Sequence, residues 1–412
     1  MIINRKTLNN GLRVVHHQDN GTQMVAVNTI YKVGARNEDP DHTGFAHLFE
    51  HLMFGGSVNI PDYDTPLQEA SAENNAFTDA DYTNYYVTIP AQNIETALWL
   101  ESDRMLSLAF TPQSLEVQRK VVMEEFKQTS LNQPYGDLAH ILFALAYKKH
   151  PYRWPVIGLD LSHIAEATME QVKDFFSKWY RPDNAILTID GNISWERTQE
   201  LVEKWYADIP SNPSTRPVVN IPSEPRQDRQ RRKTVRRNVP NSLVIIAFHI
   251  PTMTHPDFRA CDMLSDVLAN GKSSRFYKKL VEEQNLFVQL SASVMGRVDS
   301  GLFLIEGLLA DGTDIIVAED SIWKELQPLH SELVDENEIE KLKNKFEANH
   351  NLQTANYLQR AQMLAHCEML GDARMIDSEV EKYCQLTPQL LRKVSRKYLT
   401  KKNSVVLRYL TK

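Results

Sequence analysis

The sequence has few of the features that mark membrane or disulfide-bonded proteins. Its 412 residues include only three cysteines, Cys261, Cys367 and Cys384. They are scattered and odd in number, which supports neither a disulfide framework nor a cysteine zinc site and fits a reducing compartment. No window approaches twenty consecutive apolar residues, so we expect no membrane-spanning helix. The first residues lack the apolar segment of a signal peptide, and we therefore expect a cytoplasmic protein.

The overall charge does not favour nucleic acid as a partner. The formal net charge is −7 at pH 7, which is unfavourable for binding a polyanion. One basic cluster, from Arg226 to Arg237, is an exception and offers a surface to an anionic partner. No aromatic residues that would stack on bases are interleaved with it. We interpret the cluster as a linker end that runs into a strand, and we expect neither a nucleic-acid nor a membrane partner.

An internal repeat indicates how the chain is divided. The strand-like run around Val25 recurs around Val244, at an offset of 219 residues. The helix–turn–strand pattern that opens at Thr168 recurs at Thr387, with the same offset of 219. The same offset relates a segment near the start and a segment near the end of each half. This favours a duplicated unit of about 200 residues, the size of one large domain.

The predicted fold class is α+β, with two homologous repeats. Each half opens with strand-like alternation and continues with long helical patterns, which favours a mainly antiparallel sheet with helices packed on one face. The proline-rich segment 213–230 suits an extended linker, because it cannot sustain a helix or a central strand. We predict a zinc-binding catalytic repeat at 1–212, this linker, and a repeat without zinc at 231–412.

The segment HTGFAHLFEHLMFGGS, from His42, places two histidines and a glutamate in an almost wholly apolar stretch. Burying charge without partners costs several kcal/mol, or shifts a pKa until the charge is lost. The segment predicts a helix that stops near Gly55. On that helix His47 and His51 share one face and have the spacing to hold one Zn²⁺ ion. Glu50 lies beside them, where it is able to take a proton from the attacking water.

The second repeat helps to decide between a metal site and a pair of satisfied core histidines. At the offset of 219 the three residues are replaced by Asp266, Ala269 and Asn270. The repeated unit therefore does not need the two histidines and the glutamate in order to fold. We favour the metal site.

A catalytic zinc usually has three protein ligands and one open position. The helical segment from Ser114 offers two adjacent candidates for the third ligand, Glu124 and Glu125. The apolar stripe of this segment is formed by Leu115, Val122 and Phe126. At 100° per residue Glu125 lies at the edge of the stripe and Glu124 nearly opposite. We predict Glu125 as the ligand and Glu124 as an exposed helix charge.

These residues resemble the inverted-motif zinc peptidases, or inverzincins, which include pitrilysin, insulysin and mitochondrial processing peptidase. The motif is His-x-x-Glu-His with a glutamate seventy-odd residues further on, and Glu125 follows His51 by 74 residues. The segment ENNAFTDADYTNYYVTIP is similar to the family's Asn-Ala-x-Thr strand. The resemblance implies a processing-peptidase-like zinc endopeptidase that cuts peptides or unfolded segments. It also implies that the substrate adds as an extra strand along Asn75, Ala76, Phe77 and Thr78.

The sequence departs from this resemblance in its second half. Active members carry an arginine and a tyrosine that bind the substrate, and here Val281 and Val288 stand at those positions. Arg275 and Tyr277 belong to a separate segment and do not replace them. The resemblance implies that two chains enclose the active chamber. We therefore expect a heterodimer with a related zinc-less chain that carries the missing pair, although a homodimer is possible. The alternative function is that of a non-catalytic structural subunit with the same fold.

Overall fold

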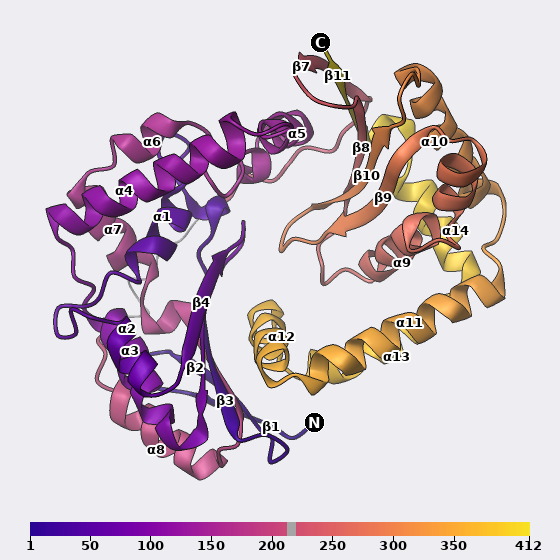
Figure 1. The fold of residues 1–412 in the computed structure, drawn as a ribbon. Coiled ribbons are helices and arrows are strands. Elements are labelled where there is room, and N and C mark those ends of the chain that lie inside the picture. Colours follow the sequence, from indigo (N-terminus) through magenta and orange to yellow (C-terminus); the bar gives the residue numbers. More distant parts are fainter. Residues whose placement is uncertain (212–219) are drawn as a thin grey trace. The chain divides into compact units, whose positions relative to one another are not determined.

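The computed structural model describes residues 1–211 and 220–412, which form two compact units (Figure 1). Unit 1 comprises Met1–Gln128, Trp154–Pro222 and Asn351–Ser378, and unit 2 comprises Thr129–Arg153, Ser223–His350 and Glu379–Lys412. Each unit has one sheet and its own helices, so the predicted α+β class is confirmed. The predicted linker at 213–230 lies partly outside the described residues, and the repeat boundaries remain a prediction.

Unit 1 contains a six-stranded sheet in the order β1-β2-β6-β3-β5-β4. The pair β2–β6 is parallel and the other neighbours are antiparallel. The strands are β1 (Ile3–Thr7), β2 (Arg13–Gln18), β3 (Met24–Tyr31), β4 (Glu73–Thr78), β5 (Thr83–Pro90) and β6 (Ala185–Gly191). The helices are α1 (Phe45–Leu52), α2 (Asp64–Glu69), α3 (Ile94–Leu106), α4 (Pro112–Phe126), α6 (Leu161–Ala165), α7 (Met169–Trp179), α8 (Trp195–Tyr206) and α12 (Tyr357–Leu370).

Unit 2 contains a five-stranded sheet in the order β7-β11-β8-β10-β9. Its strands are β7 (Arg231–Arg237), β8 (Leu243–Ile250), β9 (Phe287–Met295), β10 (Gly301–Leu309) and β11 (Ser404–Thr411). Its helices are α5 (Leu138–Ala146), α9 (Asp257–Ala269), α10 (Ile315–Ser331) and α14 (Pro388–Tyr398), while α11 (Glu336–Ala355) and α13 (Met375–Cys384) contain residues of both units. The second part of the basic cluster, Arg231–Arg237, forms β7, in which Arg232 pairs with the buried carboxylate of Glu319.

The two sheets are related by the offset seen in the sequence. β3 at Met24–Tyr31 corresponds to β8 at Leu243–Ile250, and α7 at Met169–Trp179 corresponds to α14 at Pro388–Tyr398. The sheet orders also match strand for strand, except that β1 has no counterpart among the described residues of unit 2. The offset therefore identifies a true repetition of topology.

The repeats exchange one helix each. By sequence α5 lies in the first half, but it belongs to unit 2 and contacts β7 and β11. Its counterpart α12 lies in the second half, but it belongs to unit 1 and contacts β2, β3 and β6. Each exchanged helix covers the sheet face that the unit's other helices leave open, as Figure 1 shows for α12. The prediction of helices on one face only is therefore incomplete.

Side-chain alternation explains why the unit 1 sheet needs this cover. Val25 and Val27 of β3 point into the main core together with α1 and α3. Ile30 of β3 points to the other face, where it packs with Ile186 and with Leu364 of α12. Because successive residues of a strand face opposite sides, both sets are buried only if both faces are covered.

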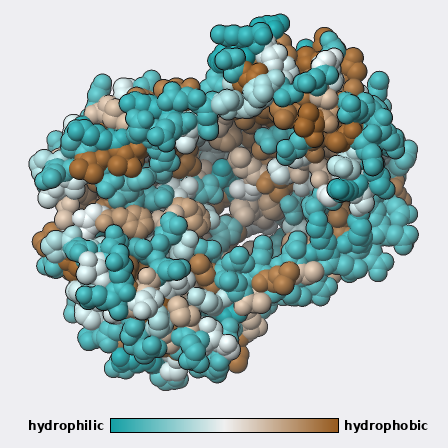
Figure 2. All heavy atoms as spheres, in the orientation of Figure 1, coloured by the Kyte–Doolittle hydropathy of each residue, from teal (hydrophilic) through white to brown (hydrophobic). Residues whose placement is uncertain are grey.

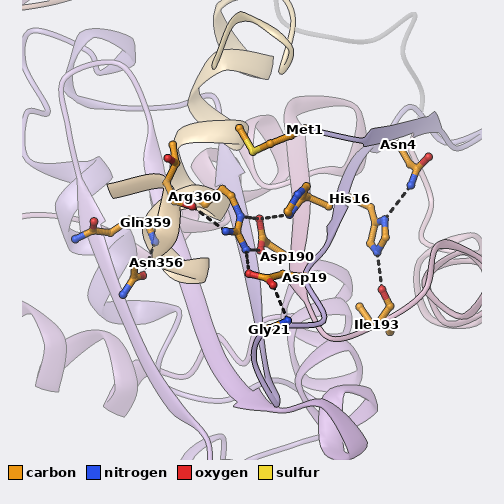
Figure 3. A network of polar contacts seen from close by, with 12 residues as sticks. Met1, Asn4, His16, Asp19, Gly21, Asp190, Ile193, Asn356, Gln359 and Arg360 are labelled. Carbon is orange, nitrogen blue, oxygen red and sulfur yellow. Dashed lines mark hydrogen bonds and ion pairs between the residues drawn. The ribbon is translucent and has the colours of Figure 1, made fainter. Parts of the chain in front are cut away.

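A buried ion pair fixes α12 on the sheet (Figure 3). The guanidinium of Arg360 donates to both carboxylate oxygens of Asp190, at 2.8 and 2.6 Å, and to Asp19 at 2.6 Å. The Asp190 side chain is fully buried and that of Arg360 is only 6% exposed. At the other end of α12, Glu368 accepts a hydrogen bond from Arg5 at 2.8 Å. The helix is therefore held by charge at both ends.

Removing the Arg360 charge should destabilise unit 1. In Arg360→Leu the buried carboxylate of Asp190 loses its bidentate partner, and breaking such a pair typically costs about 3–5 kcal/mol. Urea unfolding followed by circular dichroism should show a transition at lower denaturant concentration. Arg374→Leu is the matched control, because Arg374 pairs with Asp372 at the exposed end of the same segment and is 68% exposed. Its unfolding midpoint should not change, and equal shifts in both variants would contradict the prediction.

Candidate metal centre

Helix α1 separates an apolar face from a polar one. Phe45, Leu48, Phe49 and Leu52 are buried in the main core of unit 1. On the opposite side His47, Glu50 and His51 are only partly buried. The helix follows Gly44, whose φ of +88° suits glycine, and it ends before the predicted stop near Gly55. The sequence pattern therefore produces a short helix that offers three polar groups on one side.

A buried carboxylate satisfies the N-terminus of α1. Glu38 accepts hydrogen bonds from the backbone N–H groups of Gly44 at 2.9 Å and Ala46 at 2.8 Å. The indole N–H of Trp154 donates to the same carboxylate at 3.1 Å. Burial raises the pKa of Glu38 to about 8, while the hydrogen bonds that it accepts oppose the rise. Glu38 and Trp154 thereby fix the start of the helix that carries the histidines.

The structure brings His47, His51 and Glu125 together. Their candidate ligand atoms all lie within 4.8 Å of one another. Glu125 Oε2 of α4 lies 3.7 Å from Nε2 of His47 and 3.4 Å from Nε2 of His51. The two imidazole rings are nearly perpendicular, at 88°, with their centroids 4.9 Å apart. This is the set of three that the sequence predicts as metal ligands.

The distances fit a zinc ion. Zinc binds nitrogen and oxygen at about 2.0–2.1 Å in tetrahedral sites, which places neighbouring ligand atoms about 3.3–3.4 Å apart. In the structure, Oε2 of Glu125 lies 3.4 Å from Nε2 of His51 and 3.7 Å from Nε2 of His47. Two imidazoles and one carboxylate also form a donor set typical of catalytic zinc, with a fourth position open. The residues therefore fit the ion, and their role as ligands remains a prediction.

The neighbouring glutamate points elsewhere. Glu124 pairs with Lys127 at 3.5 Å, and its side chain is 56% exposed. The apolar stripe used to choose between the two glutamates is present, because Leu115, Val122 and Phe126 are all buried. On the outer side of α4, Val117 and Val121 are exposed, and a hydrophobic group lies over this helix in Figure 2. Helical geometry alone thus accounts for which carboxylate faces the histidines.

Burial shifts the pKa values of two groups in the site, His47 and Glu50. It lowers the pKa of His47 from 6.5 to about 4, and the nearby His51 acts in the same direction. His47 is therefore neutral near pH 7, which is the form that binds a metal. Burial also raises the pKa of Glu50 above its usual value, while a hydrogen bond from Thr78 opposes the rise. A carboxylate with a raised pKa is better suited to accept a proton.

The predicted substrate strand lies at the edge of the sheet. Within the described residues β4 pairs only with β5, so its other side is open. Asn75 and Phe77 point to the more exposed face, and Phe77 is 38% exposed. Ala76 and Thr78 point to the other face, where Ala76 packs against the main core. The hydroxyl of Thr78 donates to Oε2 of Glu50 at 2.5 Å, a contact that the sequence did not predict.

In unit 2, Val281 and Val288 stand where the resemblance leads us to expect an arginine and a tyrosine. Their surroundings differ. Val281 lies in the short helical segment Tyr277–Glu283 and packs against the core of this unit. Val288 of β9 is 61% exposed. Arg275 is engaged in an ion pair with Glu338 at 2.8 Å. Unit 2 therefore presents no arginine at the position of Val281 and no tyrosine at that of Val288.

Comparisons with known proteins agree with these observations. Residues 13–158 match a family model described as insulinase, peptidase family M16. Residues 166–346 match a second model, described as the inactive domain of peptidase M16. The chain belongs to the M16 peptidase family. The model for the inactive domain covers residues of the second repeat, which lacks the two histidines and the glutamate of α1.

Relatives in this family are named as zinc proteases, which supports a peptidase-type function and a zinc cofactor. Zinc protease PqqE of Helicobacter pylori is 32% identical over 82% of this chain and 77% of its own length. The uncharacterized zinc protease YmxG of Bacillus subtilis is 24% identical over 74% of this chain and 73% of its own. The crystal structure of a protease from Helicobacter pylori covers 99% of both chains with 27% identity and a TM-score of 0.94.

The sequence predicts no membrane-spanning helix. Among the described residues, every helix is too short or too polar to cross a bilayer. The expected cytoplasmic location remains a prediction.

Substitution of the three predicted ligands should reduce zinc binding. The wild-type chain should bind about one zinc ion, and His47→Ala or His51→Ala should lose it, because two ligands hold the ion too weakly. Glu125→Gln should lower the zinc affinity markedly. Glu124→Gln is the matched control and should bind zinc like the wild type. Metal analysis after dialysis against a chelator would measure this, and zinc loss in Glu124→Gln but not in Glu125→Gln would exchange their roles.

Proposed function

We propose that this chain is a zinc endopeptidase that cleaves peptides or unfolded polypeptide segments. The observation that carries the proposal is the approach of His47, His51 and Glu125 at separations suited to zinc. Glu50 lies on the same face of α1 as the two histidines. The edge strand β4 reaches this glutamate through Thr78. A metal site, a carboxylate base and an open strand edge together support zinc-dependent hydrolysis of an extended peptide.

Glu50 acts as the general base in this proposal. Bound zinc would supply a Lewis acid that activates water and polarises the scissile carbonyl. Oε2 of Glu50 accepts the hydrogen bond from the hydroxyl of Thr78, and the backbone of Thr78 also donates to this carboxylate. A carboxylate has about four lone-pair sites, so the group is still able to take the proton of the attacking water. The same carboxyl group then delivers the proton to the leaving nitrogen.

The substrate is held as an added strand on β4. An extended peptide would bond to the open main-chain edge of Asn75–Thr78, as in other cases of strand addition. The side chains of Asn75 and Phe77 face one side of the sheet and that of Thr78 the side of Glu50. Main-chain recognition accepts many sequences, so we propose unfolded segments as the substrate class.

Replacing Glu50 should separate metal binding from catalysis. Glu50→Gln keeps the shape of the side chain but removes the base, so turnover of a fluorogenic peptide should fall by a factor of about 10² or more. Its zinc content should equal that of the wild type. Loss of zinc with residual cleavage would mean that Glu50 is a ligand rather than the base. If the wild type binds zinc but cleaves no peptide with any partner, the alternative of a structural subunit is favoured.

We also propose that the active form is a heterodimer. The positions expected to carry a substrate-binding arginine and tyrosine hold Val281 and Val288, and neither valine donates a hydrogen bond from its side chain. Loss of one donor to a developing oxyanion typically costs a factor of about 10²–10³ in rate. A homodimer of this chain would lack such donors at these positions. A related zinc-less chain with the pair would supply them.

Mixing this chain with such a partner should increase its activity. The purified chain alone should cleave peptides slowly, and addition of the zinc-less relative should raise the turnover number about a hundredfold, since donors of this kind have that effect. Size-exclusion chromatography should show a complex of one chain of each kind. A partner whose arginine and tyrosine are replaced by valine is the matched control and should give little stimulation. Full activity of the chain alone would contradict the heterodimer proposal.

A further inference from the structure

Strand β4 offers main-chain groups along its open edge and side chains on its two faces. Its residues alternate strictly, with Glu73, Asn75 and Phe77 exposed and Asn74, Ala76 and Thr78 partly buried. A strand that adds to the edge would bond to main-chain groups, which lie in the plane of the sheet. The side chains of the second set point out of this plane toward α1. A bound peptide therefore leaves these side chains in their places.

Thr78 is the residue of β4 whose side chain reaches the base. It is the last residue of the strand, paired with Thr83 of β5 before a tight turn in which Asp79 N–H donates to the carbonyl of Tyr82 at 2.8 Å. The turn and the strand pairing fix its backbone from both sides. Its hydroxyl hydrogen bond to Oε2 of Glu50, at 2.5 Å, joins two segments 28 residues apart in sequence.

This hydrogen bond selects one orientation of the carboxylate. Glu50 is only partly buried, and among the described residues it accepts a side-chain hydrogen bond from Thr78 alone. Glutamate has three rotatable side-chain bonds, so an unrestrained carboxylate would occupy several rotamers. The hydroxyl holds Oε2, and the backbone of Thr78 also donates to the carboxylate, so both contacts of this residue restrict the orientation of Glu50. A reacting group gains most when it is held in one productive geometry.

We propose that Thr78 is a positioning residue that holds the general base Glu50, so that the strand that binds the substrate also orients the base. This deepens the proposed function and rests on it. Thr78 then contributes to the chemical step through Glu50 and does not bind the peptide through its side chain. The sequence-based prediction that Thr78 contacts the substrate stays a prediction, and in this proposal that contact is made by its main chain.

The test compares Thr78→Val and Thr78→Ser in the zinc-loaded full chain, with the partner chain that gives full activity. Valine has nearly the same shape as threonine but cannot donate. We expect the turnover number of Thr78→Val to fall about tenfold or more, because a misplacement of about 1 Å can cost a hundredfold. The KM and the zinc content should stay within about twofold of the wild type. Thr78→Ser keeps the hydroxyl and should retain activity within about threefold.

Thr88→Val is the matched control. Thr88 lies at the other end of the same strand pair, opposite Glu73, and its hydroxyl makes no hydrogen bond to a described residue. This variant should match the wild type. A rise in KM with unchanged turnover in Thr78→Val would overturn the inference and assign the side chain to the substrate. Equal losses in the serine and valine variants would also overturn it.

Crystal structures of the zinc-loaded wild type and Thr78→Val give a readout independent of activity. The Glu50 carboxylate should leave its wild-type position in Thr78→Val and keep it in Thr78→Ser. An unchanged Glu50 in Thr78→Val would overturn the inference. Absence of peptidase activity from the wild type would instead disprove the proposed function, while these structures would still decide whether Thr78 holds Glu50.

Discussion

Burial of the apolar face of α1 is the constraint on which the candidate site depends. The ring of Phe49 is fully buried, with its centroid 4.8 Å from that of Phe175 and 5.2 Å from that of Tyr180. Any rotation of the helix that turned the histidines away from Glu125 would also pull Phe49 out of this cluster. Exposing a side chain of this size costs about 1.5–3 kcal/mol. The core thereby fixes the direction of the imidazoles, although it does not contact them through polar groups.

A buried ion pair in α3 supports helix α1 through Tyr85. Arg104 and Glu101 of α3 form an ion pair whose side chains are 2% and 1% exposed. The guanidinium lies 4.5 Å from the ring centroid of Tyr85, and the Tyr85 hydroxyl donates to the carbonyl of Phe49 at 3.4 Å. A pair of this kind is costly to disturb, since removal of either partner leaves an uncompensated charge. The α1 backbone is therefore supported by Tyr85 here and capped by Glu38 at its start.

The sequence predicts local features of this protein better than contacts between distant segments. The offset of 219 identified the repeat because similar segments recur along the chain. The helical stripe of α4 indicated that Glu125 rather than Glu124 faces inward, because this depends on helical periodicity alone. The exchange of α5 and α12 was not predicted, since a helical pattern does not say which sheet the helix will cover. One contact that holds α12 on its sheet, Arg360 with Asp190, joins residues 170 apart. Glu38 and the orientation of Thr78 were missed for the same reason, as single polar residues carry no periodic signal.

The second repeat shows which parts of α1 serve packing and which serve chemistry. At the positions of Phe45, Leu48 and Phe49 helix α9 has Leu264, Val267 and Leu268, all buried. At the two histidine positions it has Asp266 and Asn270, which bond to each other at 2.5 Å.

The polar groups of α9 are satisfied inside unit 2. The ammonium of Lys345 donates to the side-chain oxygen of Asn270, so its positive charge lies near Asp266. Within the ranges that the structure describes, the only cluster of side chains suited to a metal ion is the one in unit 1. Helices α1 and α9 therefore both have the apolar face that their cores require. Their polar faces differ, because α9 lacks the two histidines and the glutamate of α1. Since packing does not require two histidines and a glutamate on α1, their presence there is best explained by chemistry.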